Sequence, residues 1–311
     1  MKNLKIIVII LAIAMAVLFF FISHNQEKPK KQKPIVAVTT FALYDIVKHI
    51  AGDTVEIVHI LPFGVDPHSF EPTPQLMAKI EKSALVIYSG AGLEPWTQGF
   101  HFKSKVIDMS QHVKLRTLGA NEHELHNHHD AHAVHTATDP HYWLDFSNMQ
   151  RATKVITEAL SELLPKNSAY YKENEKRYIA MLQNLDKRYK EKLSSCKAGT
   201  VVVSHNALGY LSRNYGFHVE SLTGLSPEAQ PSAKDVTRIM NDIKREGVTT
   251  IFFEHFVNDK VIKRIAKDTH IKIDVFQPLA NITKDEADAH LDYEDMMKQN
   301  LKKLSKALMC K

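Results

Sequence analysis

The chain has 311 residues, of which 44% are hydrophobic and 24% charged, and it is long enough for two α/β lobes that each have a core. Its formal net charge is +5, and part of that charge lies in a lysine cluster at residues 28–33. A nucleic-acid-binding protein needs a basic stripe within its folded domain, so the charge does not support a nucleic acid as partner.

The N-terminus carries a targeting pattern. Lys2 and Lys5 precede an uninterrupted apolar run at residues 6–22, and a polar linker follows. This order is typical of a secretory signal peptide or an N-terminal membrane anchor. The run is longer than a usual signal core and slightly shorter than a membrane span, so cleavage and anchoring both stay open. We expect residues 1–33 to be this segment plus linker, and the protein to be periplasmic or otherwise extracytoplasmic.

Residues 34–165 have the pattern of an N-terminal α/β lobe. Apolar runs predict strands at residues 35–39, 55–61 and 85–88. Helical periodicity predicts helices at residues 40–50 and 73–82. Strands that alternate with helices are typical of a parallel sheet covered by helices.

Residues 119–139 differ in composition from the rest of this lobe. Few of them are apolar, so the segment cannot bury a core, and we expect a flexible surface loop. Six of its residues are histidines: His123, His126, His128, His129, His132 and His135.

The middle of the chain is strongly helical. A predicted helix at residues 149–163 is followed by one at 168–193, which has about seven turns. The second helix is long enough to join two lobes, and we expect residues 166–197 to form this linking helix. Residues 198–311 then form the C-terminal α/β lobe. Its strands are expected at 200–203, 218–222, 250–253 and 271–276, and its helices at 207–215, 232–246, 259–268 and 292–309.

The chain has two cysteines, Cys196 and Cys310. They do not form a C-x-x-C pair, so a thiolate zinc site is excluded. In an oxidising compartment they can form a disulfide, but sequence does not show whether their Cα atoms approach closely enough. The pairing stays open at this point.

Three histidines occupy turns next to predicted strands or helices: His68, His141 and His205. In open α/β sheets, ligands bind beyond the carboxyl ends of the strands, where such side chains can converge. Imidazole suits Zn²⁺, and three His ligands with one further position make a tetrahedral site. The carboxylates that are candidates to orient these rings are Asp66, Asp139 and Asp145. A single histidine in a loop is more often a surface residue or a hydrogen-bonding turn residue than a metal ligand.

Three ordered motifs carry a resemblance. Residues 62–72 read PFGVDPHSFEP, residues 139–145 read DPHYWLD, and residues 204–210 read SHNALGY. They resemble signatures of the cluster 9 solute-binding proteins, which bind zinc or manganese for ABC importers. The resemblance implies two (β/α) lobes with parallel sheets joined by one rigid helix. It also implies metal ligands at His68, His141 and His205 in the lobe interface, a membrane permease as partner, and a monomer.

The same resemblance bears on the metal. Manganese members have an acidic third ligand and an aspartate as the fourth, whereas here the third position is His205 and the fourth falls near Gln277. Nitrogen ligands favour Zn²⁺ over Mn²⁺, and water or an unplaced carboxylate then completes the site. A His-rich loop is common among the zinc members, and the resemblance implies weak, multivalent zinc collection or zinc sensing by residues 119–139. A loop without function is the alternative.

The leading hypothesis is therefore a non-enzymatic carrier that delivers Zn²⁺ to an ABC importer. A manganese or iron carrier of the same family is one alternative. A secreted zinc hydrolase and a surface adhesin are alternatives from other classes. A hydrolase needs a general base and a substrate pocket beside its metal, and the chain has no H-E-x-x-H motif. The long helix predicts small lobe motions.

Overall fold

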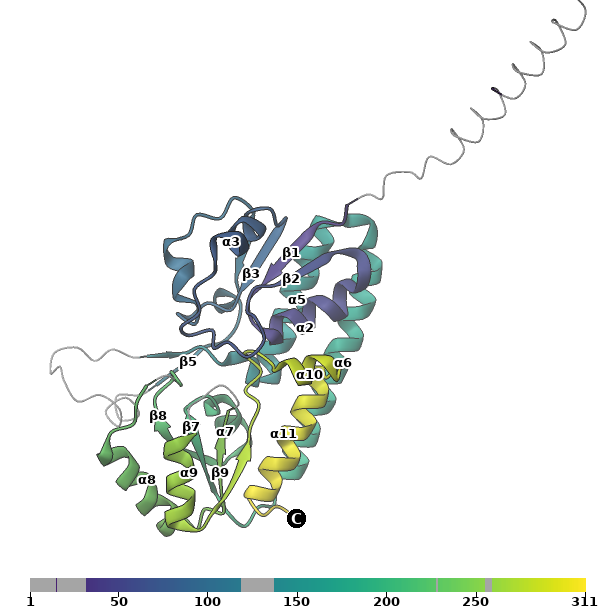
Figure 1. The fold of residues 1–311 in the computed structure, drawn as a ribbon. Coiled ribbons are helices and arrows are strands. Elements are labelled where there is room, and N and C mark those ends of the chain that lie inside the picture. The colour runs from purple at the N-terminus through teal and green to yellow at the C-terminus, as the bar shows by residue number, and fades with distance from the viewer. Residues whose placement is uncertain (1–14, 16–31, 119–136, 228, 255–258) are drawn as a thin grey trace, which may run out of the picture. The chain divides into compact units, whose positions relative to one another are not determined.

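The structure, a computed structural model, describes residues 15, 32–118, 137–227, 229–254 and 259–311 (Figure 1). The chain divides into two units, Met1–Lys33 and Pro34–Lys311. Apart from residue 15, the predicted apolar run at 6–22 lies outside the described residues. Where the chain is described, no helix has both the length and the apolar character needed to cross a membrane.

The first sheet of Pro34–Lys311 is parallel, with the strand order β2-β1-β3-β4. Its strands are β1 (Ile35–Val38), β2 (Glu56–His59), β3 (Leu85–Tyr88) and β4 (Lys105–Asp108). Its early helices are α2 (Phe41–Ala51) and α3 (Pro74–Glu81). Strand β1 is apolar throughout and almost wholly buried, because helices cover such sheets on both faces. Sequence did not predict β4, which has only two apolar residues between its charged ends.

Two short strands and two helices follow. Strands β5 (Arg116–Thr117) and β6 (Thr138–Asp139) pair in antiparallel fashion on either side of residues 119–136, which lie outside the described ranges. Helix α5 (Phe146–Leu163) precedes α6 (Ser168–Leu193), whose 26 residues span about 39 Å. The bounds of α6 are those that the sequence predicts.

Helix α6 contacts elements from both halves of the chain. Tyr178 donates its hydroxyl hydrogen to Asp45 Oδ2 in α2 at 2.7 Å, and Tyr189 donates to the Met297 carbonyl near the C-terminus at 2.7 Å. Figure 1 shows α6 running beside both sheets. The helix therefore joins two lobes, and the predicted fold class is confirmed.

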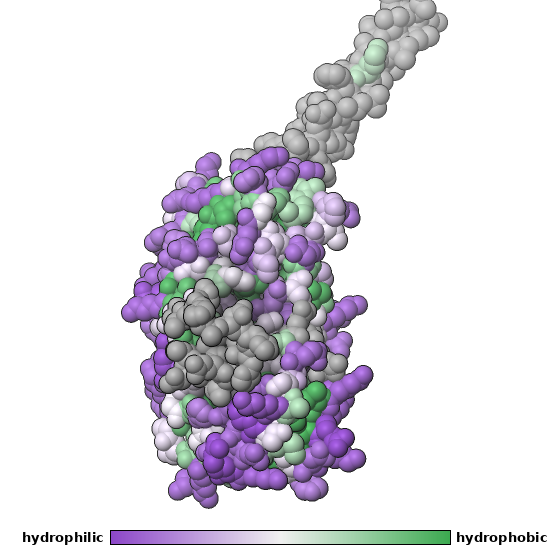
Figure 2. Space-filling model, turned by 90° about the vertical axis from the view of Figure 1, so that its left-hand side faces the viewer, coloured by the Kyte–Doolittle hydropathy of each residue, from purple (hydrophilic) through white to green (hydrophobic). Residues whose placement is uncertain are grey.

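The second sheet is also parallel, with the order β10-β9-β7-β8. Its strands are β7 (Thr200–His205), β8 (His218–Thr223), β9 (Thr250–Phe253) and β10 (Lys272–Val275). Its helices are α7 (Gly209–Tyr215), α8 (Ala233–Glu246), α9 (Lys260–Thr269), α10 (Lys284–Asp288) and α11 (Tyr293–Ala307). The short, polar α10 was not predicted. The face of the molecule drawn in Figure 2 is mostly hydrophilic, as a hydrated surface is.

Cys196 and Cys310 form a disulfide. The sequence left open whether these two cysteines pair. The bond joins the chain just after α6 to the chain just after α11, across a sequence separation of 114 residues. The closed loop therefore contains the whole second sheet and its helices.

Candidate metal centre

His68, His141 and His205 meet at the boundary between the two lobes. One ring nitrogen from each lies within 4.8 Å of the others. The Nε2 atoms of His141 and His205 are 3.4 Å apart, close to the roughly 3.3 Å expected for two nitrogens about 2.05 Å from one tetrahedral Zn²⁺. In the described ranges, no other group of three or more such side chains has this spacing.

His68 lies in the proline-containing loop between β2 and α3. Its backbone N–H donates to Asp66 Oδ1 at 3.0 Å, so Asp66 holds the turn and does not orient the ring through this bond. The loop is also bound from the second lobe. Asn281 Nδ2 donates to the carbonyls of Pro62 and Val65 at 2.6 and 2.8 Å. Sequence reasoning did not single out Asn281.

His141 lies two residues after the end of strand β6. Asp139 Oδ1 accepts the backbone N–H of His141 at 3.0 Å and contacts its Nδ1 at 2.9 Å. Both side chains are fully buried. This carboxylate orients the ring so that Nε2 faces the other two histidines, the role that the sequence predicts for Asp139.

His205 is the last residue of β7, and its Nδ1 lies against the Glu254 carboxylate. Glu254 directly follows β9, which pairs with β7. Sequence reasoning did not select Glu254 as an orienting residue. The available signal was its place at the carboxyl end of a predicted strand in the same parallel sheet.

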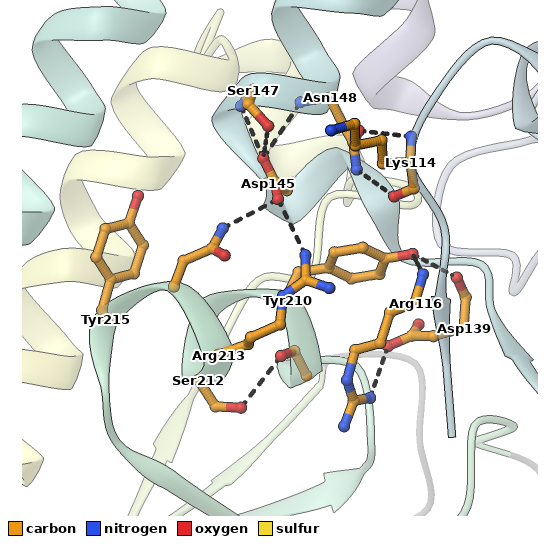
Figure 3. Close-up of polar contacts among 12 residues, drawn as sticks. Lys114, Arg116, Asp139, Asp145, Ser147, Asn148, Tyr210, Ser212, Arg213 and Tyr215 are labelled. Carbon is orange, nitrogen blue, oxygen red and sulfur yellow. Dashed lines mark hydrogen bonds and ion pairs between the residues drawn. The ribbon is translucent and has the colours of Figure 1, made fainter. Parts of the chain in front are cut away.

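Asp145 does not orient any of the three rings, and that prediction was wrong. Its Oδ1 caps α5 by accepting the backbone N–H groups of Ser147 and Asn148 at 2.8 and 3.2 Å. Its Oδ2 accepts from Arg213 and Asn214 of α7 at 3.3 and 3.0 Å (Figure 3). An aspartate directly before a helix is a preferred N-cap, and this local role is the one it has.

The electrostatics of the three rings differ. Burial, together with the neighbouring His141 and His205, holds the pKa of His68 well below its usual value. Burial also acts to lower the pKa of His205, but the carboxylates of Glu254, Asp66 and Asp139 outweigh it and raise that pKa. Among the described residues, the buried His68 Nε2 has no hydrogen-bond partner, which costs free energy unless a cation accepts its lone pair. The donor set therefore fits a divalent cation.

The cavity between the rings is small. Its volume is about 20 Å³, and Asp66, Glu254 and Ala280 are among the side chains that line it. A volume of this size holds about one water-sized particle, whereas organic ligands need roughly 300 Å³ or more. The described residues leave room in this cavity for an ion but not for an organic substrate.

The sequence predicted a fourth ligand near Gln277, but the Gln277 side chain is hydrogen-bonded to Glu286 and Leu279. Its Nε2 donates to both carboxylate oxygens of Glu286 at 3.1 and 2.9 Å, and its Oε1 accepts the Leu279 N–H at 3.3 Å. The nearby carboxylates that line the cavity are instead Asp66 and Glu254. The six histidines of the His-rich loop lie outside the described residues.

Two α/β lobes joined by one long helix, with a buried cluster of imidazoles between them, define the class of metal-binding solute-binding proteins. Residues 36–307 match the family model described as ZnuA, zinc-uptake complex component A, periplasmic. The chain belongs to this family.

Individual relatives agree with this assignment. The chain is 33% identical to the high-affinity zinc uptake system protein ZnuA of Bacillus subtilis (strain 168) over 287 residues, which are 91% of this chain and 90% of the relative. It is 29% identical to the zinc-binding lipoprotein AdcA of Streptococcus pneumoniae (strain ATCC BAA-255 / R6) over 92% of this chain, but it spans only 58% of that relative. The Zn(II)-bound ZnuA-like domain of Streptococcus pneumoniae AdcA superposes with a TM-score of 0.73 at 28% identity, covering 89% of this chain and 99% of the domain.

Proposed function

We propose that this protein binds Zn²⁺ outside the cytoplasm and delivers it to an ABC-type importer. The observation that carries the proposal is the buried cluster of three imidazoles in a cavity that has room for an ion only. The family and the zinc-binding relatives support the choice of zinc and of transport. The disulfide supports an extracytoplasmic location, because such bonds persist in oxidising compartments.

The ligands in this proposal are the Nε2 atoms of His68, His141 and His205. A set of nitrogen donors favours Zn²⁺ over Mn²⁺. The fourth position is filled by water or by one of the carboxylates that line the cavity, Asp66 or Glu254. These two carboxylates also balance the charge of the ion.

In this proposal, zinc is cargo and the protein has no catalytic role. The small cavity favours a carrier over the zinc hydrolase, which has to admit a substrate beside its metal. The proposed partner is the membrane permease of the importer, and the proposed carrier acts as a monomer. Its lobes are residues 34–165 and 198–311, with the linking helix at 166–197. A signal peptide or anchor at residues 1–33 and weak zinc collection at 119–139 stay predictions from the sequence.

Zinc should raise the melting temperature of the purified protein. A ligand that binds only the native state at 100 times its Kd adds about 2.7 kcal/mol to the free energy of unfolding, or about 4–5 °C in Tm for a chain of this size. Scanning calorimetry with and without Zn²⁺, reversed by a chelator, measures the shift, and isothermal titration gives the affinity. Stabilisation by Mn²⁺ but not by Zn²⁺ would overturn the proposed metal.

The affinity for zinc should fall as the pH falls, beginning above pH 6.5. Because the pKa of His205 is raised, its ring keeps a proton that competes with zinc up to a higher pH than an ordinary histidine. His68, whose pKa is lowered, does not compete in this range. Glu254→Gln removes the charge that raises the His205 pKa, so the pH at which affinity declines should move down. At high pH the same variant should bind about 10- to 100-fold more weakly, because the ring loses its orienting partner.

Competition titrations between pH 5.5 and 8.5 test this profile. Glu246→Gln is a matched control, since that carboxylate lies on the exposed part of α8 and contacts Arg245. Identical pH midpoints for the wild-type protein and Glu254→Gln would contradict the role of Glu254.

A further inference from the structure

The carboxylate that orients His141 is itself held by a second side chain. Arg116 lies directly opposite Asp139 in the ladder of β5 and β6. Its Nη1 is 3.2 Å from Asp139 Oδ2, while Asp139 Oδ1 contacts His141 Nδ1 at 2.9 Å. Both oxygens of the buried Asp139 are therefore engaged. Arg116 contacts Oδ2, as Figure 3 shows, and the metal-site histidine contacts Oδ1.

A tyrosine from the second lobe bridges the same two strands. The Tyr210 hydroxyl accepts the backbone N–H of Arg116 at 2.8 Å and donates to the backbone carbonyl of Asp139 at 2.9 Å. Its side chain is fully buried. A single phenol group thus connects α7 to the backbone of both residues of the pair, as Figure 3 shows.

The residue before this tyrosine permits the close approach. At Gly209, an added Cβ would overlap the Arg116 guanidinium and lie 2.9 Å from Asp139 Oδ2. Any larger residue would have to displace the ion pair from its place under α7. Glycine at this position therefore allows the backbone of the second lobe to pack directly on the pair that orients His141.

These contacts join the chain segments that carry two of the proposed ligands. Asp139 precedes His141 by two residues, and Tyr210 follows His205 by five. We propose that Arg116, Gly209 and Tyr210 are positioning residues that set the placement of His141 relative to His205. This inference rests on the proposed function. The network holds the two Nε2 atoms at a separation suited to one ion, so that the ligands are arranged before zinc arrives.

The test uses the full chain with Tyr210→Phe, which removes both hydrogen bonds and keeps the ring. Tyr215→Phe is the matched control, because Tyr215 lies on the same helix and its hydroxyl donates to Asp186, away from the metal cavity. Three quantities are measured: the zinc Kd by chelator competition, the Tm without metal and with zinc, and the visible absorption spectrum with Co²⁺. The spectrum reports ligand geometry, which a change in general stability does not alter.

Tyr210→Phe is expected to bind zinc about 10- to 100-fold more weakly, with a smaller zinc-induced rise in Tm and an altered Co²⁺ spectrum. Tyr215→Phe should keep the wild-type Kd and spectrum, whatever its Tm. Arg116→Lys keeps a cation beside Asp139 and should retain more affinity than Arg116→Ala. Wild-type Kd and spectrum in Tyr210→Phe would overturn the positioning role alone. Failure of the wild-type protein to bind zinc would instead overturn the proposed function.

Discussion

Replacing His205 by alanine should weaken zinc binding on the order of 100- to 4000-fold. The binding free energy of Zn²⁺ at structural sites in small proteins is about 10–16 kcal/mol, so one of three protein ligands accounts for roughly 3–5 kcal/mol of it. Each 1.4 kcal/mol of binding free energy is about a factor of ten in Kd. The ring is buried, and its Nε2 lies 3.4 Å from that of His141, so the substitution removes one nitrogen donor from the cluster.

Chelator competition measures the loss of affinity in His205→Ala. His112→Ala serves as the matched control, because His112 is exposed and lies outside the metal cavity. Melting of the metal-free variant shows whether the lobe still folds. A folded His205→Ala protein with the wild-type Kd would refute the ligand role of this residue.

Removing the disulfide should lower the free energy of unfolding by about 5 kcal/mol. In the chain-entropy account, a cross-link stabilises a protein by restricting the unfolded chain, and the effect grows with the length of the closed loop, here 114 residues. For a chain of this size, such a loss corresponds to a fall in Tm of about 8 °C.

The double variant Cys196→Ser/Cys310→Ser, compared with the wild-type protein by scanning calorimetry, measures this loss. Wild-type protein treated with a reductant is a second test that leaves the sequence unchanged. The zinc affinity should be retained, since neither cysteine lines the metal cavity. A Tm within about 2 °C of the wild-type value would show that the bond does not stabilise the fold in this way.

Elements with a strong local pattern were predicted closely. Helix α6 begins and ends where its apolar spacing indicated, and the buried strands β3 and β9 match their predicted ranges. Strand β4 was missed because it has little apolar character of its own and depends on pairing with β3. Helix α10 was missed because its five residues are polar, and its capping box of Thr283 and Glu286 stabilises it locally.

The amino-acid sequence by itself determined most of the order of strands and helices, the long linking helix and the three histidines that the structure brings together. These follow from apolar periodicity and from short motifs, which act over a few residues. Only the tertiary structure decided the disulfide, the pairing of Glu254 with His205, and the placement of Arg116 and Tyr210 around Asp139. Each of those contacts joins residues that are far apart in the chain, and folding alone brings them within bonding distance.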